Sequence, residues 1–136
     1  MDELKETAEK LAELLRKRGE HIERLAKDPV PEVTRHDLEE ALKKKASFLF
    51  FTADWCGPCI SFLETFRSIA LEYSTPEVFF GRVDVDRSPS IPEKYNIEKI
   101  PSIAVFINGK LVDVIIGSMS KEALKRRIES YLKRIE

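Results

Sequence analysis

The stretch FLFFTADWCGPC, residues 48–59, combines a strand-like apolar run with two cysteines three positions apart. Phe48 to Phe51 is apolar on both faces, which suits a strand that is covered by helices on both sides. From Cys56 to about Tyr73 the apolar residues recur at helical spacing. The cysteines therefore fall where a buried strand turns into a helix, and their predicted chemistry follows from that position.

The first turn of a helix makes a cysteine pair reactive. Residues three apart lie on one face, at a separation that a disulfide can bridge. Unpaired amides and the positive end of the helix dipole stabilise a thiolate at Cys56. We therefore predict that the pKa of Cys56 falls below the ~8.5 of a free thiol and that Cys56 attacks a substrate disulfide. Cys59 then resolves the mixed disulfide, and another reductant must restore the dithiol.

The two residues between the cysteines agree with this interpretation. Pro58 suits the first helical turn, where its missing amide is not needed, and Gly57 lets a substrate approach closely. A zinc half-site is the rival interpretation of the pair, but a closed zinc site needs four ligands. Only His21 and His36 remain as nitrogen ligands, far upstream. We expect His21 to be a solvated helix residue and His36 a loop or cap residue.

Alternating periodicities around this stretch predict an α/β fold. A helix over 37–45 is followed by strands over 47–52 and 78–85, which flank the 56–73 helix in a βαβ unit. A short helix is expected at 91–95. Strands over 103–107 and 111–116 flank Asn108-Gly109, a dipeptide typical of two-residue hairpins. A last helix, capped by Ser118 to Ser120, runs through Ile135. Together these elements predict a mixed sheet with helices on both faces.

Residues 1–28 are predicted to form an N-terminal helical extension, and residues 29–136 the main domain. Apolar residues recur through 2–27 at steps of three, four and seven, which indicates an amphipathic helix that Gly19 could bend or break. The segment Asp28-Pro29-Val30-Pro31 ends the pattern. We expect the apolar stripe to pack against the chain's own domain; self-association and docking to a partner are the alternatives.

Composition limits the classes of function. The 136 residues suit one domain. The net charge of −1 gives no overall positive potential that would attract nucleic acid or an anionic membrane. The longest apolar run has four residues, so no membrane helix is expected. The first residues carry no secretory signal or transit peptide, so a cytoplasmic location is expected. The sequence contains no Gln and abounds in Lys, Arg and Glu, a bias known from hot environments.

Several motifs together resemble the thioredoxin family over residues ~33 to 136. They are WCGPC after a buried strand, VDVD at 83–86, Ile100-Pro101, the Phe-x-Asn-Gly-Lys of 106–110, and Gly117. The resemblance implies a thioredoxin fold and reduction of disulfides in protein substrates through a redox-active Cys56–Cys59 disulfide. It also implies a thioredoxin-reductase-like electron donor and neither a metal nor an organic cofactor.

The resemblance further assigns a substrate groove. It implies that Pro101 is in the cis form and faces the cysteines, that Trp55 borders the active site, and that Gly117 lies on the apolar rim. The expected substrate-binding residues are Trp55, Ile100, Pro101 and Gly117. Arg82 falls where family members often carry a lysine near the buried end of the site, and we leave open whether it has an electrostatic role.

Two residues depart from the family pattern. Phe50 stands six residues before Cys56, where many members carry a buried aspartate that moves the proton of the second cysteine. We expect Phe50 to be a core residue, so that proton transfer at Cys59 relies on water or another group. Glu64 replaces a proline that usually kinks the active-site helix, and a straighter helix is expected.

The same motifs leave other functions open. A disulfide oxidase or isomerase is the nearest alternative, because the dipeptide between the cysteines tunes the potential, and Gly-Pro favours the reducing end. Glutaredoxin fits less well because its usual intervening residues are Pro-Tyr. A binding module with weak redox activity is the alternative from a different class, with Phe50 as the sign of relaxed catalytic demands.

Overall fold

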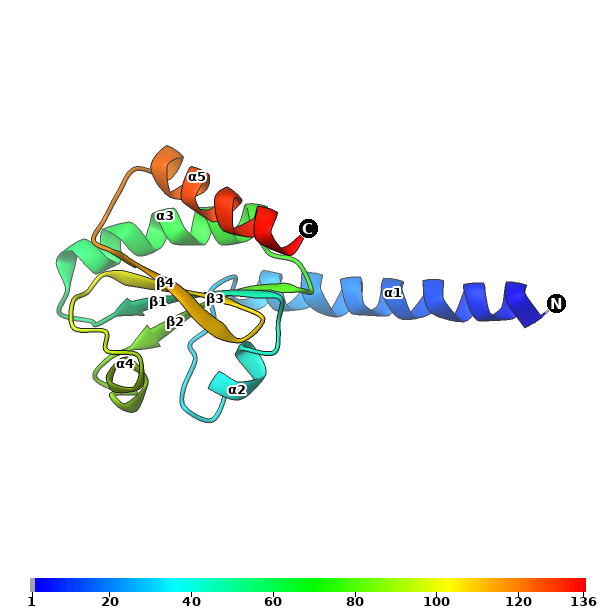
Figure 1. The fold of residues 1–136 in the computed structure, drawn as a ribbon, viewed down its shortest axis with the longest axis horizontal. Helices are drawn as coiled ribbons and strands as arrows, with labels where there is room; N and C mark the ends of the chain where they lie inside the picture. The colour runs from blue at the N-terminus through cyan, green and yellow to red at the C-terminus, as the bar shows by residue number, and fades with distance from the viewer. Residues whose placement is uncertain (1) are drawn as a thin grey trace.

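The computed structural model describes residues 2–136, which form a four-stranded sheet, helices on both of its faces and one projecting helix (Figure 1). In chain order the elements are α1 (Asp2–Lys27), α2 (Leu38–Ala41), β1 (Ala46–Thr52), α3 (Gly57–Tyr73), β2 (Val78–Asp84), α4 (Ser90–Lys94), β3 (Ser102–Ile107), β4 (Lys110–Ile116), α5 (Lys121–Leu132) and the 3₁₀ helix η1 (Lys133–Ile135). The strand order is β2-β1-β3-β4, with β1 parallel to β2 and antiparallel to β3. The predicted mixed sheet with helices on both faces is confirmed.

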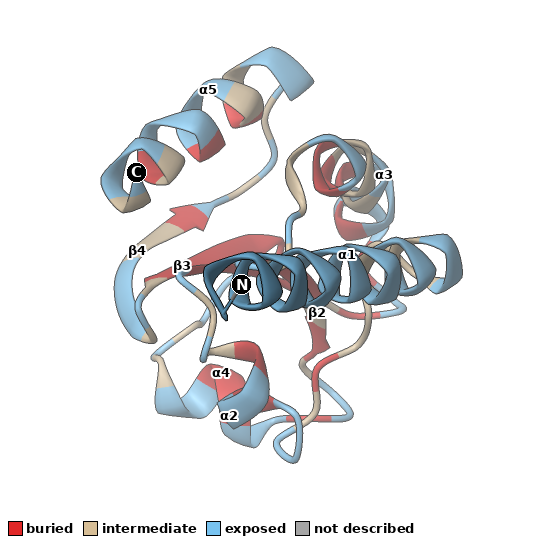
Figure 2. Cartoon of the chain, turned by 90° about the vertical axis from the view of Figure 1, so that its right-hand side faces the viewer, coloured by how far each residue is buried: buried red, intermediate tan, exposed pale blue. Residues whose placement is uncertain are grey.

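The sheet separates two apolar layers. Phe48 and Phe50 of β1 point to the layer under α3 and α5, while Leu49 and Phe51 point to the layer over α2 and α4. All four side chains are fully buried, because β1 is an inner strand with helices on both sides. The four-residue apolar run that stood out in the sequence therefore lies in the core, on an inner strand of the sheet. Figure 2 shows that the buried residues gather on the sheet and on the sides of the helices that face it.

The β3–β4 hairpin has the turn that its sequence predicts. Asn108 and Gly109 have φ values of 51° and 80°, the left-handed conformation that two-residue hairpin turns require. A Cβ on Gly109 would lie 3.1 Å from the carbonyl oxygen of Leu42, so the turn also packs closely against the end of α2. Ser120 caps α5 by accepting a hydrogen bond from the Ala123 amide at 3.2 Å.

The helix predicted over 37–45 is shorter than expected. α2 has only four residues, because the chain turns away from the helix to enter the sheet. The amides of Lys45 and Ala46 donate to the Glu77 carbonyl before β2, at 3.0 and 3.3 Å. Ser47 Oγ then donates to the Ala41 carbonyl at 2.8 Å, which satisfies an acceptor at the end of α2. Pairing with a distant segment therefore overrides the local helical pattern.

α1 is one continuous helix through Gly19, but the expectation that its stripe packs on the domain was wrong. None of its residues is buried, and it projects away from the sheet (Figures 1 and 2). Asp28 turns the chain into a linker, residues 28–33, that runs along the edge of β2. The Val33 amide donates to the Arg82 carbonyl, and the Arg82 amide donates to the Pro31 carbonyl. That edge is therefore covered by the linker and not by α1.

Only the last turns of α1 approach the domain. His21 and Leu25 are half-buried, and His21 Nε2 is enclosed without a hydrogen-bond partner among residues 2–136. The prediction of a solvated His21 was therefore wrong, because Asp28, Pro29 and Pro31 of the linker lie near it. Asp28 accepts from Arg82 at 2.9 Å and from the Val30 amide at 3.0 Å. Burial opposes ionisation of Asp28, but these hydrogen bonds outweigh it and lower its pKa.

Candidate active site

Cys56 and Cys59 form a disulfide at the start of α3. Their Cα atoms are 5.2 Å apart, within the range that a disulfide spans. Cys56 is the N-cap residue, and its sulfur accepts a hydrogen bond from the Cys59 amide at 3.2 Å. Cys56 is 6% exposed and Cys59 is fully buried, so Cys56 is the more accessible residue of the pair.

The local sequence explains why the cysteines lie at the mouth of the helix. The chain leaves β1 at Thr52 and tightens into a turn in which the Cys56 amide donates to the Ala53 carbonyl at 3.1 Å. Pro58 lies in the first turn of α3, where no intrahelical donor is required. The Ile60 amide donates to the Cys56 carbonyl at 3.2 Å and begins the helical ladder. An amide-rich helix start is thereby aimed at the sulfur of Cys56.

Trp55 is held beside the disulfide by an acidic loop. Its indole is 70% exposed, and Nε1 donates to the Asp86 carboxylate at 2.8 Å. The loop itself is organised by buried Asp84, which accepts from the amides of Asp86 and Arg87 at 2.9 and 3.0 Å. Residues 83–86 were predicted only as part of a family pattern, and neither the Asp86 nor the Asp84 role was predicted from the sequence. The missed signal is Asp84 followed by polar residues at the end of a buried strand, a typical Asx-turn arrangement.

The loop before β3 and the end of β4 meet at one backbone hydrogen bond. The Ile100–Pro101 bond is cis, as the resemblance implied. The Gly117 amide donates to the Pro101 carbonyl at 2.9 Å, and Gly117 has a φ of 87°. Ile100 packs against the apolar cluster that contains Ala53 and both cysteines. A backbone hydrogen bond therefore joins two separate predicted motifs, Ile100-Pro101 and Gly117, and Ile100 packs on the cluster to which both cysteines belong.

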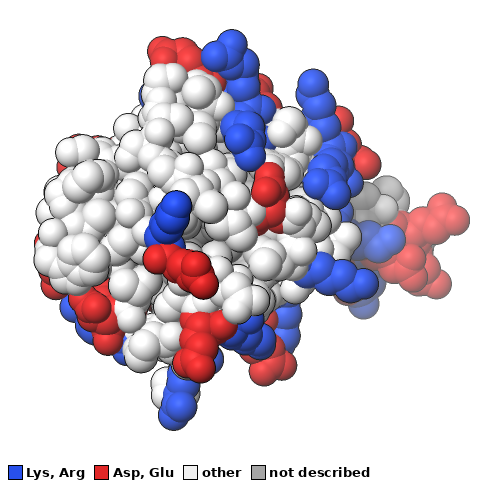
Figure 3. All heavy atoms as spheres, turned by 60° about the vertical axis from the view of Figure 1, so that its left-hand side comes forward, with Lys and Arg blue, Asp and Glu red and all other residues white. Residues whose placement is uncertain are grey.

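Two exposed isoleucines near the predicted site residues were not predicted from the sequence. Ile60, in the first turn of α3 after Cys59, is 57% exposed, and Ile116, before Gly117, is 62% exposed. Figure 3 turns forward the end of the molecule where α3 begins and shows a broad area without Lys, Arg, Asp or Glu. An uncharged surface of this kind suits contact with an uncharged polypeptide segment.

Three comparisons with known proteins agree with this geometry. A family model for thioredoxin matches residues 29–130. The chain is 35% identical to a thioredoxin of Griffithsia pacifica over 96 residues, covering 70% of this chain and 87% of that protein. It is 30% identical to a thioredoxin of Staphylococcus aureus over 103 residues, covering 76% of this chain and 98% of that protein. The structure of a mutant thioredoxin from Halobacterium salinarum superposes on this chain with a TM-score of 0.67 at 27% identity. The superposition covers 76% of this chain and 91% of that one.

The chain belongs to the thioredoxin family. Family membership and the Cys56–Cys59 disulfide make it a thiol–disulfide oxidoreductase of the disulfide-reductase kind. Thioredoxins act on disulfide-containing proteins and are reduced by a reductase, which describes the general kind of partner. Residues 2–136 contain no helix that is long and apolar enough to cross a membrane, and no cluster of three or more candidate metal ligands.

Phe50 is a core residue, as expected, in this thioredoxin fold. It is fully buried, and its ring centroid lies 5.6 Å from that of Phe62 and 5.2 Å from that of Phe66. Within the described part of the chain, Asp84 is the one buried carboxylate, and it is occupied by its own turn and by Arg87. Cys59 belongs to the buried aromatic and aliphatic cluster that also contains Phe50, Phe62 and Phe66.

Arg82 and Glu64 also differ from the common thioredoxin pattern. Arg82 pairs with Asp28 at 2.9 Å and donates to the Val30 carbonyl, so it ties β2 to the linker after α1. The charge of Arg82 therefore has a structural role, in contacts with the linker rather than with the cysteine pair. Glu64 is exposed within α3, which runs as one helix from Gly57 to Tyr73.

Proposed function

We propose that this chain reduces disulfides in other proteins through a mixed disulfide with Cys56. The observation that carries the proposal is the position of the Cys56 sulfur, at the N-cap of α3 and within hydrogen-bond distance of the Cys59 amide. A helix N-terminus favours the thiolate, which is the attacking form of a cysteine. The dithiol form is therefore expected to hold its reactive charge on the more accessible of the two sulfurs.

The proposed reaction balances in two exchanges. The Cys56 thiolate attacks one sulfur of the substrate disulfide, forming a Cys56–substrate bond and releasing the other substrate sulfur as a thiolate, which takes a proton from water. Cys59 then loses its proton and attacks the Cys56 sulfur. The Cys56–Cys59 bond forms, the mixed disulfide breaks, and the second substrate thiol leaves. The substrate gains two electrons and two protons, which a reductase must later return to the protein.

The second exchange depends on removing a proton from Cys59. Cys59 is fully buried beside aromatic side chains, and Phe50 cannot act as a base. We propose that water admitted at the Cys56 side takes this proton. Burial in apolar surroundings raises the pKa of a thiol, so resolution should be slower near neutral pH than attack.

We propose that the substrate lies along Trp55, Ile100, Pro101 and Gly117, with Gly57 and Pro58 between the two sulfurs. This assignment is supported by the exposed Trp55 indole, the Gly117–Pro101 hydrogen bond and the uncharged surface at this end of the molecule. The exposed Ile60 and Ile116 side chains would extend the same surface. A reductase that restores the dithiol would bind the same surface. The proposed setting is a reducing compartment such as the cytoplasm, because the reductase direction requires a strong electron donor.

The test is reduction of insulin with dithiothreitol as the electron source. We expect this chain to accelerate insulin precipitation at least tenfold over dithiothreitol alone, and a Cys56→Ser variant to remove that acceleration. A Cys59→Ser variant should accumulate a covalent complex with insulin through Cys56, visible by mass spectrometry and released by reductant. A folded protein that neither accelerates the reaction nor traps insulin would instead support a binding module.

An oxidase or isomerase of the same fold is separated by the reduction potential. The protein is equilibrated with glutathione buffers of different reduced-to-oxidised ratios, and thiol alkylation then measures the fraction of Cys56–Cys59 disulfide at each ratio. A potential of about −270 mV, typical of thioredoxins, is expected for a reductase. A potential of about −120 mV would contradict the proposal, because such a disulfide oxidises its substrates.

A further inference from the structure

α1 is unusual for a surface helix because one of its exposed faces is apolar at every seam position but one. Leu4, Leu11, Leu15 and Ile22 recur at steps of seven and four, and each is at least 56% exposed. We call these four residues, with Ala8 between them, the α1 stripe. Leu14, at 59% exposure, borders the stripe. Such a spacing is that of the buried seam of a coiled coil, which needs a second helix to cover it.

The charges of α1 are divided between its two halves. Residues 2–13 carry five acidic and two basic side chains, a net charge of −3. Residues 16–27 carry five basic and two acidic side chains, a net charge of +3. Two parallel copies of α1 would place like charges together in both halves. Two antiparallel copies would place each acidic half beside a basic half, which is favourable in both.

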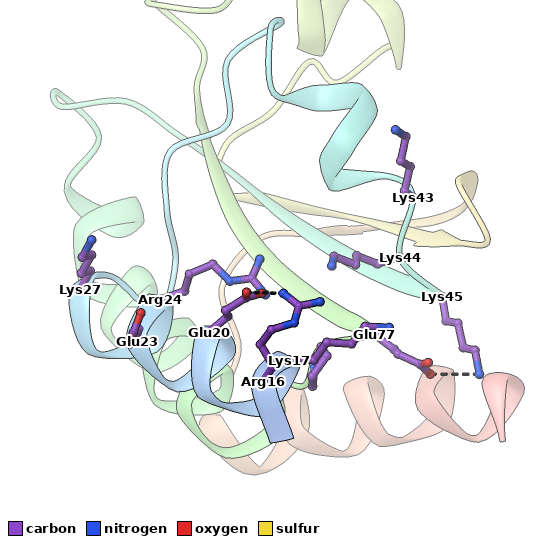
Figure 4. Close-up of a pocket in the computed structure, with 11 residues that line it drawn as sticks. Arg16, Lys17, Glu20, Glu23, Arg24, Lys27, Lys43, Lys44, Lys45 and Glu77 are labelled. Atoms are coloured by element: carbon purple, nitrogen blue, oxygen red, sulfur yellow. Dashed lines mark hydrogen bonds and ion pairs between the residues drawn. The ribbon is translucent and has the colours of Figure 1, made fainter. Parts of the chain in front are cut away.

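The basic half is strengthened by the adjoining domain. Figure 4 shows Arg16, Lys17, Arg24 and Lys27 of α1 around a notch whose other side carries Lys43, Lys44 and Lys45. Seven basic and three acidic side chains line this notch. With ~100° between successive residues, the α1 side chains of the notch lie across the helix from Leu15 and Ile22, so the notch leaves the stripe free. A partner's acidic half on the stripe would lie about one helix diameter, ~10 Å, from the notch charges, so their attraction acts at long range and weakens with salt.

We propose that the α1 stripe is covered by the α1 helix of a second copy of this chain, in antiparallel orientation. The register that aligns the apolar residues places Leu4 opposite Ile22 of the other copy and Leu11 opposite Leu15. Arg18, the one charged residue on the seam, then faces the small Ala8 of the other copy. Its long stem can lie over Ala8 while its guanidinium reaches toward the acidic half of that helix.

This register also fits the position of the domain. In this register Asp2 of one helix lies level with Arg24 of the other along the helix axis, just before the half-buried Leu25 and the linker. The overlap therefore covers the free part of α1 and ends where the domain begins. Because only a few side chains from each copy are covered, we expect a weak, concentration-dependent dimer.

The first test is the mass of the full chain in solution. Between about 10 μM and 1 mM, a range that detects a Kd of ~1 mM or tighter, the weight-average mass should rise from 15.7 kDa toward twice that value. Leu11→Glu with Leu15→Glu should raise the Kd at least tenfold. Leu71→Glu is the matched control, since Leu71 is a 60% exposed leucine of α3, and its Kd should be unchanged. A monomer at 1 mM, or a dimer that survives the α1 double variant, overturns the proposal.

The second test is the orientation of the helices. In a Cys56→Ser, Cys59→Ser background, chains with Leu4→Cys are mixed with chains with Ile22→Cys and oxidised mildly. We expect the mixed disulfide to form at least tenfold faster than either homodisulfide, because the two residues at position 4 would be about 27 Å apart. Equal or faster formation of the position 4 homodisulfide overturns the antiparallel arrangement. A monomer that binds uncharged lipid vesicles through α1 would also overturn the proposal and assign the stripe to a lipid surface.

Discussion

At the scale of single residues, Phe50 belongs to the same buried apolar cluster as Cys59. Its ring packs against those of Phe62 and Phe66, and all three are buried. An aspartate at this position would be a carboxylate among phenyl rings, with no buried base or cation described beside it. The same exchange would supply a proton acceptor toward Cys59. Stability and the rate of resolution should therefore change in opposite directions at this position.

Phe50→Asp is predicted to lower the free energy of unfolding by at least ~3 kcal/mol, through loss of aromatic packing and burial of an ionisable group. Urea denaturation followed by circular dichroism measures this effect. Phe50→Leu is the matched control and should cost only about 1–2 kcal/mol, since it keeps the site apolar. An unchanged urea midpoint for Phe50→Asp would show that position 50 is accessible to water.

The Trp55–Asp86 hydrogen bond makes a second residue-scale prediction. Asp86→Ala removes the acceptor 2.8 Å from Trp55 Nε1, so the indole should become mobile. Because Trp55 is the single tryptophan, its fluorescence anisotropy reports on the indole directly. We expect lower anisotropy and a several-fold lower rate of insulin reduction, with little change in melting temperature. Asp54→Ala, which changes a neighbouring exposed carboxylate, is the control. Unchanged anisotropy in Asp86→Ala would show that the hydrogen bond does not hold the indole.

At the scale of elements, α5 is joined to β4 by an acidic side chain. Asp113 accepts hydrogen bonds from the Tyr131 hydroxyl and from Arg127 of α5, the latter at 3.1 Å. The Tyr131 hydrogen bond lowers the pKa of Asp113, although burial acts against it, and the Val114 amide and Arg127 lower it further. Burial and the same carboxylate raise the pKa of Tyr131.

The lowered pKa of Asp113 predicts how stability depends on acid. A carboxylate with a lower pKa in the folded state stabilises the fold above its unfolded value of about 3.9, and this contribution is lost as pH falls through the folded value. Asp113→Asn should therefore lower the melting temperature at pH 6 and change it much less at pH 2. Thermal unfolding of both proteins from pH 6 to pH 2 checks this. An equal difference at the two pH values would contradict the proposed role of the ionised carboxylate.

At the scale of the whole molecule, α1 stands outside the two apolar layers. It has no buried residue, whereas α3 and α5 each contribute buried side chains to the layer over the sheet. The linker after α1, in contrast, is part of the domain, because Val30 and Val33 are buried and residues 31–33 exchange backbone hydrogen bonds with Arg82 of β2. Stability should therefore depend on the linker and not on most of α1.

Removal of residues 2–20 is predicted to change the melting temperature by less than about 3 °C, because no buried apolar area is lost. The control is Val33→Ala, at a fully covered position in the linker, which should lower the melting temperature by several degrees. Both are measured at concentrations low enough to keep the chain monomeric. A large loss on removing 2–20 would mean that α1 packs on the domain in solution.

Local sequence predicted most of the elements because their signals act between near neighbours. The apolar run of β1, the Asn108-Gly109 turn and the N-cap position of Cys56 each depend on a few adjacent residues. The rest required contacts between distant positions. Trp55 and Asp86 are 31 residues apart, and α2 ends early because the segment after it pairs with Glu77.

The amino-acid order by itself determined the strand-to-helix turn that places two sulfurs one helical turn apart, because backbone preference and side-chain periodicity are properties of short segments. Only the tertiary structure decided what surrounds those sulfurs and what leaves α1 uncovered. An amphipathic pattern states that a helix needs an apolar partner and does not state where the partner is. In this chain the linker covers the nearest sheet edge, so the apolar face of α1 remains available for another surface.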